Sequence, residues 1–319
     1  MSDLLSKIDA RTRLAGTNKL EILMFTLGIH PRTGRRETFG INVFKVREVI
    51  HTPPITRAPE MPESVEGMVS LRGSLVPIIG LSSYIGIKND TPSNIMIVTE
   101  YNGHTQGFLV ESVDTILRLD WSSMKVPPEM VNTPLGGLVT AVTELTDGRL
   151  VMMLDVEKVL AETAHFGEDE AIYRNVKPIG RQNCRVFYAD DSSVARKQIA
   201  RTLEAMGIQG ISAVNGRQAW EALKQLADFS ENSHTPLKNM VNLVLTDVEM
   251  PEMDGYMLTR KIKEDKRFVG IPVLMHSSLS GSSNQQLGRA VGVDEYVSKF
   301  EPNRLSATLA RLLQTEQSP

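Results

Sequence analysis

CRVFYADD, residues 184–191, is an apolar run that ends in two aspartates. A second run, VNLVLTD (residues 241–247), ends in one aspartate, and a third, EYVSKF (residues 295–300), carries a lysine near its end. In a sheet of parallel strands the carboxyl ends converge on one edge, where such folds bind ligands. Carboxylates gathered there repel one another unless a cation neutralises them, and oxygen ligation suits Mg²⁺. The residues in question are Asp190, Asp191, Asp247 and Lys299.

The pattern around these runs alternates between strands and helices. Apolar spacing at helical period, with Gly207 placed to end the first helix, separates each strand-like run from the next. This alternation predicts an α/β domain with a parallel five-stranded sheet covered on both faces. The expected strands are 184–191, 208–214, 241–247, 271–277 and 295–300, and the expected helices are 192–206, 218–229, 255–265, 283–291 and 303–313.

The first half of the chain has a different pattern. Short apolar runs are separated by turn signals such as Arg72-Gly73, Asn102-Gly103 and Asp147-Gly148, which favour hairpins. Prolines fall between the runs, where they block strand continuation. This half is therefore expected to be mostly β, as a barrel or sandwich. The expected strands are 21–29, 40–50, 66–71, 74–81, 94–99, 106–110, 138–145 and 150–154.

Length and composition set the frame for both halves. The chain has 319 residues, which favours two domains, and a net charge of −3, which gives no electrostatic footprint for nucleic acid. No stretch has the roughly 20 apolar residues of a membrane span, no secretory signal is present, and the single cysteine, Cys184, favours a reducing compartment. We expect a cytoplasmic protein divided into an N-terminal segment (1–19), a β domain (20–165), a linker (166–182) and an α/β domain (183–319).

Each candidate residue also has an ordinary structural explanation. The Asp190-Asp191 pair, followed by Ser192, could simply cap a helix, and Asp254-Gly255 is a turn that starts one. Lys299 alone would be a surface lysine, and Ser277 could merely begin a loop. The chemistry is indicated by their combination at several strand ends of one short domain.

These residues carry a resemblance. Residues 184–313 resemble the response-regulator receiver domain of two-component signalling, through Asp190-Asp191, the segment Asp247–Gly255, Ser277, Tyr296 and Lys299. The resemblance implies a flavodoxin-like (βα)₅ fold in which Asp247 accepts a phosphoryl group from a phosphohistidine kinase.

The resemblance also implies a role for each site residue. Mg²⁺ would be held by Asp191, Asp247 and the main-chain carbonyl of Glu249, with Asp190 orienting it through water. Lys299 and the Ser277 hydroxyl would hold the phosphoryl oxygens, and an inward move of Ser277 would open space for Tyr296.

Two positions depart from the receiver pattern. Receivers usually have Lys-Pro with a cis bond on the fifth strand, whereas this chain has Lys299-Phe300, and a cis bond before a residue other than proline costs about 2.5–4 kcal/mol. Two residues after the acceptor stands Glu249, whose side chain could approach the metal or an attacking water. The lifetime of an acylphosphate is therefore left open.

Residues 20–160 resemble the CheW scaffold family of bacterial chemotaxis. The marks are Gly40–Val49, Ile55–Pro59, Gly67–Gly73, Leu75–Leu81 and Met153–Lys158, in the family's order. The resemblance implies a pair of five-stranded β-barrels that links chemoreceptors to the histidine kinase CheA. Arg72 matches an arginine of the family's Leu-Arg-Gly turn, for which we weigh an interface role against a solvated hairpin charge, while Gly80 stands where the family often has an acidic residue.

A CheW-like domain followed by a receiver is similar to the arrangement in the CheV family of coupling proteins. The function expected is a chemotaxis adaptor that binds receptor cytoplasmic tips and CheA at membrane-associated arrays, is phosphorylated on Asp247, and inserts into no membrane. It would not be a dedicated enzyme, although it could dephosphorylate itself slowly.

Two other functions account for part of the sequence pattern. A magnesium-dependent phosphatase or hydrolase would use the same carboxylates, but the chain lacks the glycine-rich phosphate loop and the typical second carboxylate that such enzymes often require. Glu249, two residues after Asp247, is the one residue that keeps this alternative open. A transcriptional regulator would need a DNA-binding output domain. Because the sequence ends at Pro319, soon after the last expected helix, we favour the adaptor.

Overall fold

The computed structural model of the chain describes residues 19–57, 59, 61–62, 64–87, 93–101, 104–127, 138–163, 173–180, 183–278, 282–299 and 301–314. Contacts divide it into two compact units, the first up to residue 164 and the second from residue 165 onward in the described part. The expected N-terminal segment, apart from Lys19, and much of the expected linker lie outside the described residues. None of the described helices is long and apolar enough to cross a membrane.

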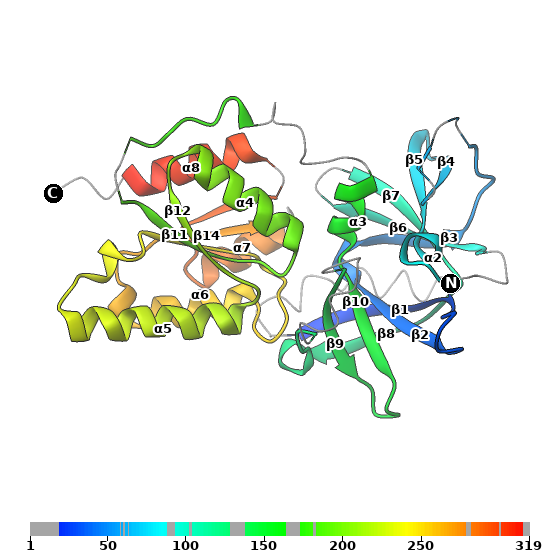
Figure 1. Cartoon of the computed structure of the whole chain (residues 1–319), viewed down its shortest axis with the longest axis horizontal. Coiled ribbons are helices and arrows are strands. Elements are labelled where there is room, and N and C mark those ends of the chain that lie inside the picture. Colours follow the sequence, from blue (N-terminus) through cyan, green and yellow to red (C-terminus); the bar gives the residue numbers. More distant parts are fainter. Residues whose placement is uncertain are drawn as a thin grey trace. The chain divides into compact units, whose positions relative to one another are not determined.

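The first unit contains two five-stranded sheets (Figure 1). One has the order β8-β1-β2-β10-β9 and the other the order β3-β6-β7-β5-β4. Most neighbours are antiparallel, as the hairpin signals predict, while β2–β10 and β5–β7 pair in parallel. The strands are β1 (Lys19–Ile29), β2 (Arg36–Asn42), β3 (Val46–His51), β4 (Val65–Leu71), β5 (Ser74–Gly80), β6 (Ile95–Tyr101), β7 (His104–Val110), β8 (Ser112–Asp120), β9 (Val139–Glu144) and β10 (Leu150–Leu154).

Central strands of these sheets are buried on both faces, which explains their continuous apolar sequence. In β1, Leu23, Phe25 and Leu27 join a core to which both sheets contribute, whereas Ile22 and Met24 join a second cluster within their own sheet. Successive side chains of a strand point to opposite faces of the sheet. A strand with an apolar cluster on each face therefore needs apolar residues at every position. The β fold thus has a shared core and a separate core for each sheet.

The structure differs from the sequence expectation at two kinds of place. The run 40–50 was predicted as one strand, but a short 3-10 turn at Val43–Lys45 divides it, so that β2 and β3 belong to different sheets. Strand β8 and helices α2 (Leu81–Ile85) and α3 (Val156–Thr163) were not predicted at all. Strand β8 is an edge strand whose side chains are mostly exposed or half-buried, so it lacks the apolar signal.

The second unit has a five-stranded parallel sheet of order β12-β11-β13-β14-β15. Its strands are β11 (Arg185–Ala189), β12 (Gln209–Ala213), β13 (Leu243–Thr246), β14 (Val273–Ser277) and β15 (Glu295–Ser298). They alternate with helices α4 (Ser193–Ala205), α5 (Gly216–Ser233), α6 (Gly255–Glu264), α7 (Ser282–Ala290) and α8 (Pro302–Gln314). The predicted α/β fold is confirmed (Figure 1).

Helices cover both faces of this parallel sheet. Apolar side chains of α4 and α8 pack on one face with Val186 of β11, and those of α5 and α6 pack on the other with Phe187. The described part of the expected linker, residues 173–180, packs with the first of these groups: Val176 is buried among the side chains of α4 and α8. This segment is therefore part of the second unit.

The loop from Asp247 to Gly255 is closed by a tight backbone contact. The main-chain N–H of Gly255 donates to the carbonyl of Val248 at 2.9 Å. A Cβ atom on Gly255 would lie 1.9 Å from the carbonyl oxygen of Asp247, so only glycine fits there. Asp254 caps helix α6 by accepting from the N–H of Met257 at 2.7 Å, as the turn interpretation of this pair predicts.

Candidate functional site

The parallel register brings the acidic residues to one edge of the sheet. Ala189 of β11 stands beside Thr246 of β13, so Asp190 and Asp247, the next residue on each strand, end adjacent strands at the same level. Ser277 of β14 stands beside Ser298 of β15, and Lys299 follows directly. The predicted convergence of strand ends is therefore present.

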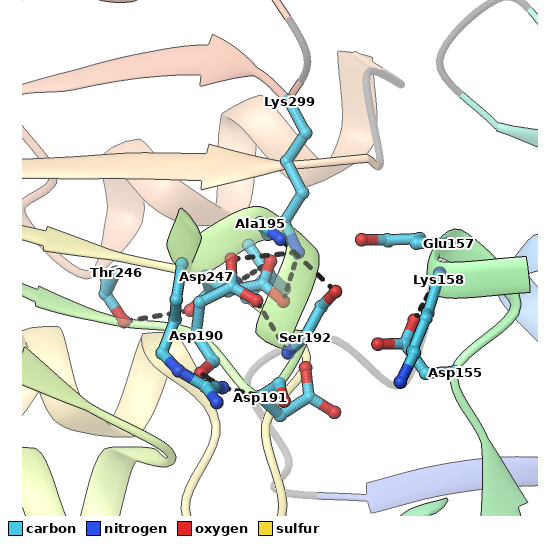
Figure 2. A network of polar contacts seen from close by, with 12 residues as sticks. Asp155, Glu157, Lys158, Asp190, Asp191, Ser192, Ala195, Thr246, Asp247 and Lys299 are labelled. Atoms are coloured by element: carbon cyan, nitrogen blue, oxygen red, sulfur yellow. Dashed lines mark hydrogen bonds and ion pairs between the residues drawn. The ribbon is translucent and has the colours of Figure 1, made fainter. Parts of the chain in front are cut away.

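The ammonium group of Lys299 lies between two carboxylates. Its Nζ is 3.0 Å from Oδ2 of Asp190 and 3.0 Å from Oδ2 of Asp247 (Figure 2). The three side chains are almost fully buried, with 0%, 3% and 1% of Asp190, Asp247 and Lys299 exposed. Like charges in such surroundings repel strongly, and the lysine offsets part of that repulsion. Lys299 is thus a buried member of the site and not a surface lysine.

Backbone N–H groups fix the other oxygen of each carboxylate. Oδ1 of Asp190 accepts from the N–H of Ser192 at 2.9 Å, and Oδ1 of Asp247 accepts from the N–H of Val248 at 2.7 Å. Each carboxylate therefore has one oxygen held by the main chain and one turned toward the lysine. Ser192, and not the aspartate pair, caps helix α4, because its Oγ accepts from the N–H of Ala195.

Asp191 completes a set of hard oxygen donors. One carboxylate oxygen from each of Asp190, Asp191 and Asp247 can be chosen so that all lie within 4.8 Å of one another. Asp191 is only half-buried, so solvent reaches this side of the cluster. Three oxygens of this kind, with access for water, fit the coordination that Mg²⁺ prefers.

The predicted switch residues lie next to the cluster. Ser277 is buried at the end of β14, and Tyr296 is half-buried on β15. Burial raises the pKa of the Tyr296 hydroxyl, a hydrogen bond with Ser277 lowers it, and the negative charges of Asp247 and Glu249 raise it further. The serine and the tyrosine are thus in contact with each other, and the tyrosine is close enough to Asp247 and Glu249 for their charges to affect its pKa.

A second tyrosine, Tyr256, belongs to the same neighbourhood. It is the second residue of helix α6, is buried, and packs in one apolar cluster with Val248, Met275 and Tyr296. Burial raises the pKa of its hydroxyl, and the neighbouring Tyr296 and acidic groups raise it further. Sequence reasoning missed this residue because a tyrosine after Asp-Gly looks like ordinary helix core.

Arg196 is the other site residue that the sequence did not predict. Its Nη1 donates to the main-chain carbonyls of Asp190 and Asp191, at 2.8 and 2.9 Å. One hint of this role is present in the sequence: Arg196 stands at the start of α4, four residues after the N-cap Ser192. A long side chain at that position can reach back to the loop before the helix. Arg196 ties that helix to the acidic pair.

Two predictions, on the Glu249 carbonyl and on the peptide bond after Lys299, are not tested by the structure. Glu249 is buried two residues after Asp247, and its proposed contribution is a main-chain carbonyl for the metal. Phe300 lies outside the described residues, so the expectation about the Lys299–Phe300 peptide bond lies outside them as well.

In the first unit, Arg72 lies at the tip of the β4–β5 hairpin. It has φ 50° and is followed by Gly73 with φ 85°, the left-handed pair that a two-residue turn requires. Its Nη2 donates to Oε2 of Glu48 on β3 at 2.8 Å, although its side chain remains 66% exposed. Arg72 is thus oriented by one ion pair and still accessible to solvent.

Comparison with known proteins agrees with this geometry. The CheW-like domain family matches residues 22–164, and the response regulator receiver domain family matches residues 186–310. Chemotaxis protein CheV1 of Helicobacter pylori is 28% identical over 98% of this chain and 99% of its own length. Chemotaxis protein CheW of Klebsiella aerogenes is 30% identical over 52% of this chain and 93% of its own, and chemotaxis protein CheY1 of Helicobacter pylori is 32% identical over 41% and 98%.

Fold, site and comparisons together define a chemotaxis signalling protein in which a CheW-like domain precedes a receiver domain. This combination is that of an adaptor with a response-regulator module and not of a dedicated enzyme. The chain belongs to the CheV family.

Replacing Lys299 by methionine is expected to destabilise the receiver strongly when no divalent cation is present. Two buried carboxylates would lose their shared counter-charge, and breaking a buried ion pair from one side costs about 3–5 kcal/mol. Added Mg²⁺ should restore part of the loss. Urea denaturation with EDTA and with Mg²⁺ measures both effects, and Lys266→Met, at an exposed lysine, is the control. A Lys299→Met protein as stable as the wild type in EDTA would contradict this account.

Asp254 is expected to make receiver stability depend on pH. Burial raises the pKa of this carboxyl from 3.8 to about 6, because the charged form is poorly solvated. The stability that this group contributes is therefore complete below pH 3.8 and is lost as the pH rises through 6. Asp254→Asn keeps a capping oxygen without the charge and should gain about 2–3 kcal/mol relative to wild type between pH 4 and pH 7. A difference between the two proteins that is constant over this range, in denaturation with EDTA, would refute the assignment.

Proposed function

We propose that this protein couples chemoreceptors to the histidine kinase CheA through its CheW-like domain, and that phosphorylation of Asp247 in its receiver domain regulates the coupling. The observation that carries the second part is the placement of the Lys299 ammonium 3.0 Å from both Asp190 and Asp247 at the edge where three strands end. A buried carboxylate beside a fixed cation, with solvent access from the Asp191 side, is a suitable acceptor for a dianionic group.

The residues divide the work of the transfer. Oδ1 of Asp247 accepts from the N–H of Val248, which is fixed in the backbone, whereas Oδ2 is paired with the side chain of Lys299, which can move. Oδ2 is therefore the oxygen that attacks the phosphorus of a phosphohistidine. An oxygen–phosphorus bond forms as the phosphorus–nitrogen bond breaks, and the histidine nitrogen leaves with the electron pair and is protonated by solvent. Lys299 then moves from bridging two carboxylates to pairing with the phosphoryl oxygens.

The acidic cluster fits a magnesium ion, which would be held by Asp191, Asp247 and the main-chain carbonyl of Glu249, with Asp190 orienting it through water. When bound, it would neutralise the negative charge that gathers between acceptor and phosphoryl group. The Ser277 hydroxyl would donate to a phosphoryl oxygen and give up its hydrogen bond with Tyr296. Tyr296 is then free to turn, which changes the surface of the receiver.

The coupling half of the proposal rests on the CheW-like domain and on Arg72. A guanidinium that is two-thirds exposed but oriented by Glu48 has donors left for a partner. The partners proposed are CheA and the cytoplasmic tips of chemoreceptors, which would place the protein in the cytoplasm at receptor arrays. The protein would bind no nucleic acid and would not insert into a membrane.

Asp247 is expected to be the single residue labelled by the kinase. Purified protein incubated with ³²P-labelled CheA and Mg²⁺ should take up phosphate, and Asp247→Ala should take up none because the attacking oxygen is gone. Asp254→Asn, whose carboxylate lies in the same loop, serves as the control and should be labelled like wild type. An unlabelled wild-type protein, or equal labelling of Asp247→Ala, would rule out the acceptor role.

Arg72→Ala is expected to weaken binding to CheA or to receptor tips about tenfold or more, since exposed arginines at interfaces are frequent sources of binding energy. Arg118→Ala is a matched control: its side chain is similarly exposed, at 55%, and pairs with Glu21 on a neighbouring strand. Pull-down and titration of the full chain with each partner measure the effect. Equal affinities for the two variants would remove Arg72 from the interface, and a wild-type chain that binds neither partner would refute the coupling role.

A further inference from the structure

Residues 173–180, here called the strap, are held along one face of the receiver. Val176 is buried in the apolar cluster formed by β11, α4 and α8, and Tyr173 and Ile179 pack against the same cluster. The N–H of Ile179 donates to the carbonyl of Met206, directly after α4, at 3.0 Å. In Figure 1 the strap is the green segment that passes beside α8 before the chain enters β11. This part of the expected linker thus packs on the receiver domain.

Tyr173 makes one favourable contact in the docked strap and leaves one polar atom unsatisfied. The guanidinium of Arg201, on α4, lies 5.8 Å from the centre of the Tyr173 ring, within the range of cation–π attraction. The Tyr173 hydroxyl oxygen, in contrast, is buried and has no hydrogen-bond partner among the described residues. A buried hydroxyl without a partner lowers stability, because in the undocked state water would satisfy it. The strap is therefore bound less tightly than its apolar contacts alone would allow.

Both helices under the strap are connected to the acceptor site. Helix α4 begins at Ser193, two residues after Asp191, and the side chain of its Arg196 donates to the main-chain carbonyls of the acidic pair. Helix α8 begins at Pro302, three residues after Lys299. If Lys299 moves away from Asp190, the start of α8, three residues further along the chain, is expected to move with it. The acidic pair remains bound to α4 through Arg196. The apolar surface that holds Val176 is made by these two helices together.

We propose that the strap is a tether whose docking depends on the state of Asp247. While Asp247 is unmodified the receiver holds the strap, and modification loosens it and lengthens the connection to the CheW-like domain. This inference rests on the proposed function of Asp247. Eight released residues span up to about 29 Å when extended, which would lower the effective concentration at which each domain meets the other's partners.

Hydrogen exchange in the strap, followed by mass spectrometry on the full chain, tests the proposal. Acetyl phosphate with Mg²⁺ modifies the receiver without a kinase, and should raise the exchange rate of the strap peptide about tenfold, within the usual range of allosteric coupling. Asp247→Ala should show no change with the same reagent. Tyr173→Phe removes the unpartnered hydroxyl and should exchange more slowly than wild type, whereas Tyr173→Ala should exchange rapidly even when unmodified.

Lys177→Ala, at an exposed strap residue, is the control and should behave like wild type. Phosphate uptake is measured in the same samples. Strap exchange that stays constant while Asp247 is modified would overturn the tether and leave the acceptor role intact. Failure of Asp247 to be modified by either acetyl phosphate or CheA would overturn both.

Discussion

The receiver half of this protein is organised around one ammonium group between two buried carboxylates. Asp190 and Asp247 end adjacent strands at the same level, and without Lys299 their charges would face each other in a poorly solvated place. The lysine arrives from β15, so this interaction ties the two central strands to the edge of the sheet. Loop geometry, helix caps and main-chain donors around the site all serve to hold those two carboxylates in position. In the function proposed here, the same arrangement would hold the attacking carboxylate beside the cation that receives the phosphoryl group.

Much of this site could be predicted because parallel sheets convert sequence position into spatial position. Once residues 184–191, 241–247 and 295–300 are assigned as parallel strands, their last polar residues must meet at one edge. The order of strands and helices followed from a clear alternation of apolar spacing. The sequence could not predict which donor binds which oxygen of the site. The hydrogen bonds from the N–H of Val248 and from the side chain of Arg196 depend on local backbone geometry, which leaves no recognisable pattern in the sequence.

The β half was harder to predict for a physical reason. A strand buried on both faces, such as β1, reads as an unbroken apolar run, and nothing in that run says which face meets which core. The passage from one sheet to the other at Val43–Lys45 occurs within a single apolar stretch, so the sequence there reads as one strand. Edge strand β8 was missed because exposure removes the apolar signal on which the prediction depends. The hairpin at Arg72-Gly73 was found because its turn needs a backbone conformation that few residue pairs favour.

The glycine at position 255 has a consequence for how the receiver can respond. Because position 255 has no side chain, the start of helix α6 packs directly against the carbonyl of Asp247, and the backbone of Asp247 has no room to move toward it. Movement around Asp247 is therefore accommodated more easily by side chains, such as those of Ser277 and Tyr296, than by the backbone at this contact. A side chain at position 255 would therefore displace Asp247 itself, the residue that the strand register places beside Asp190.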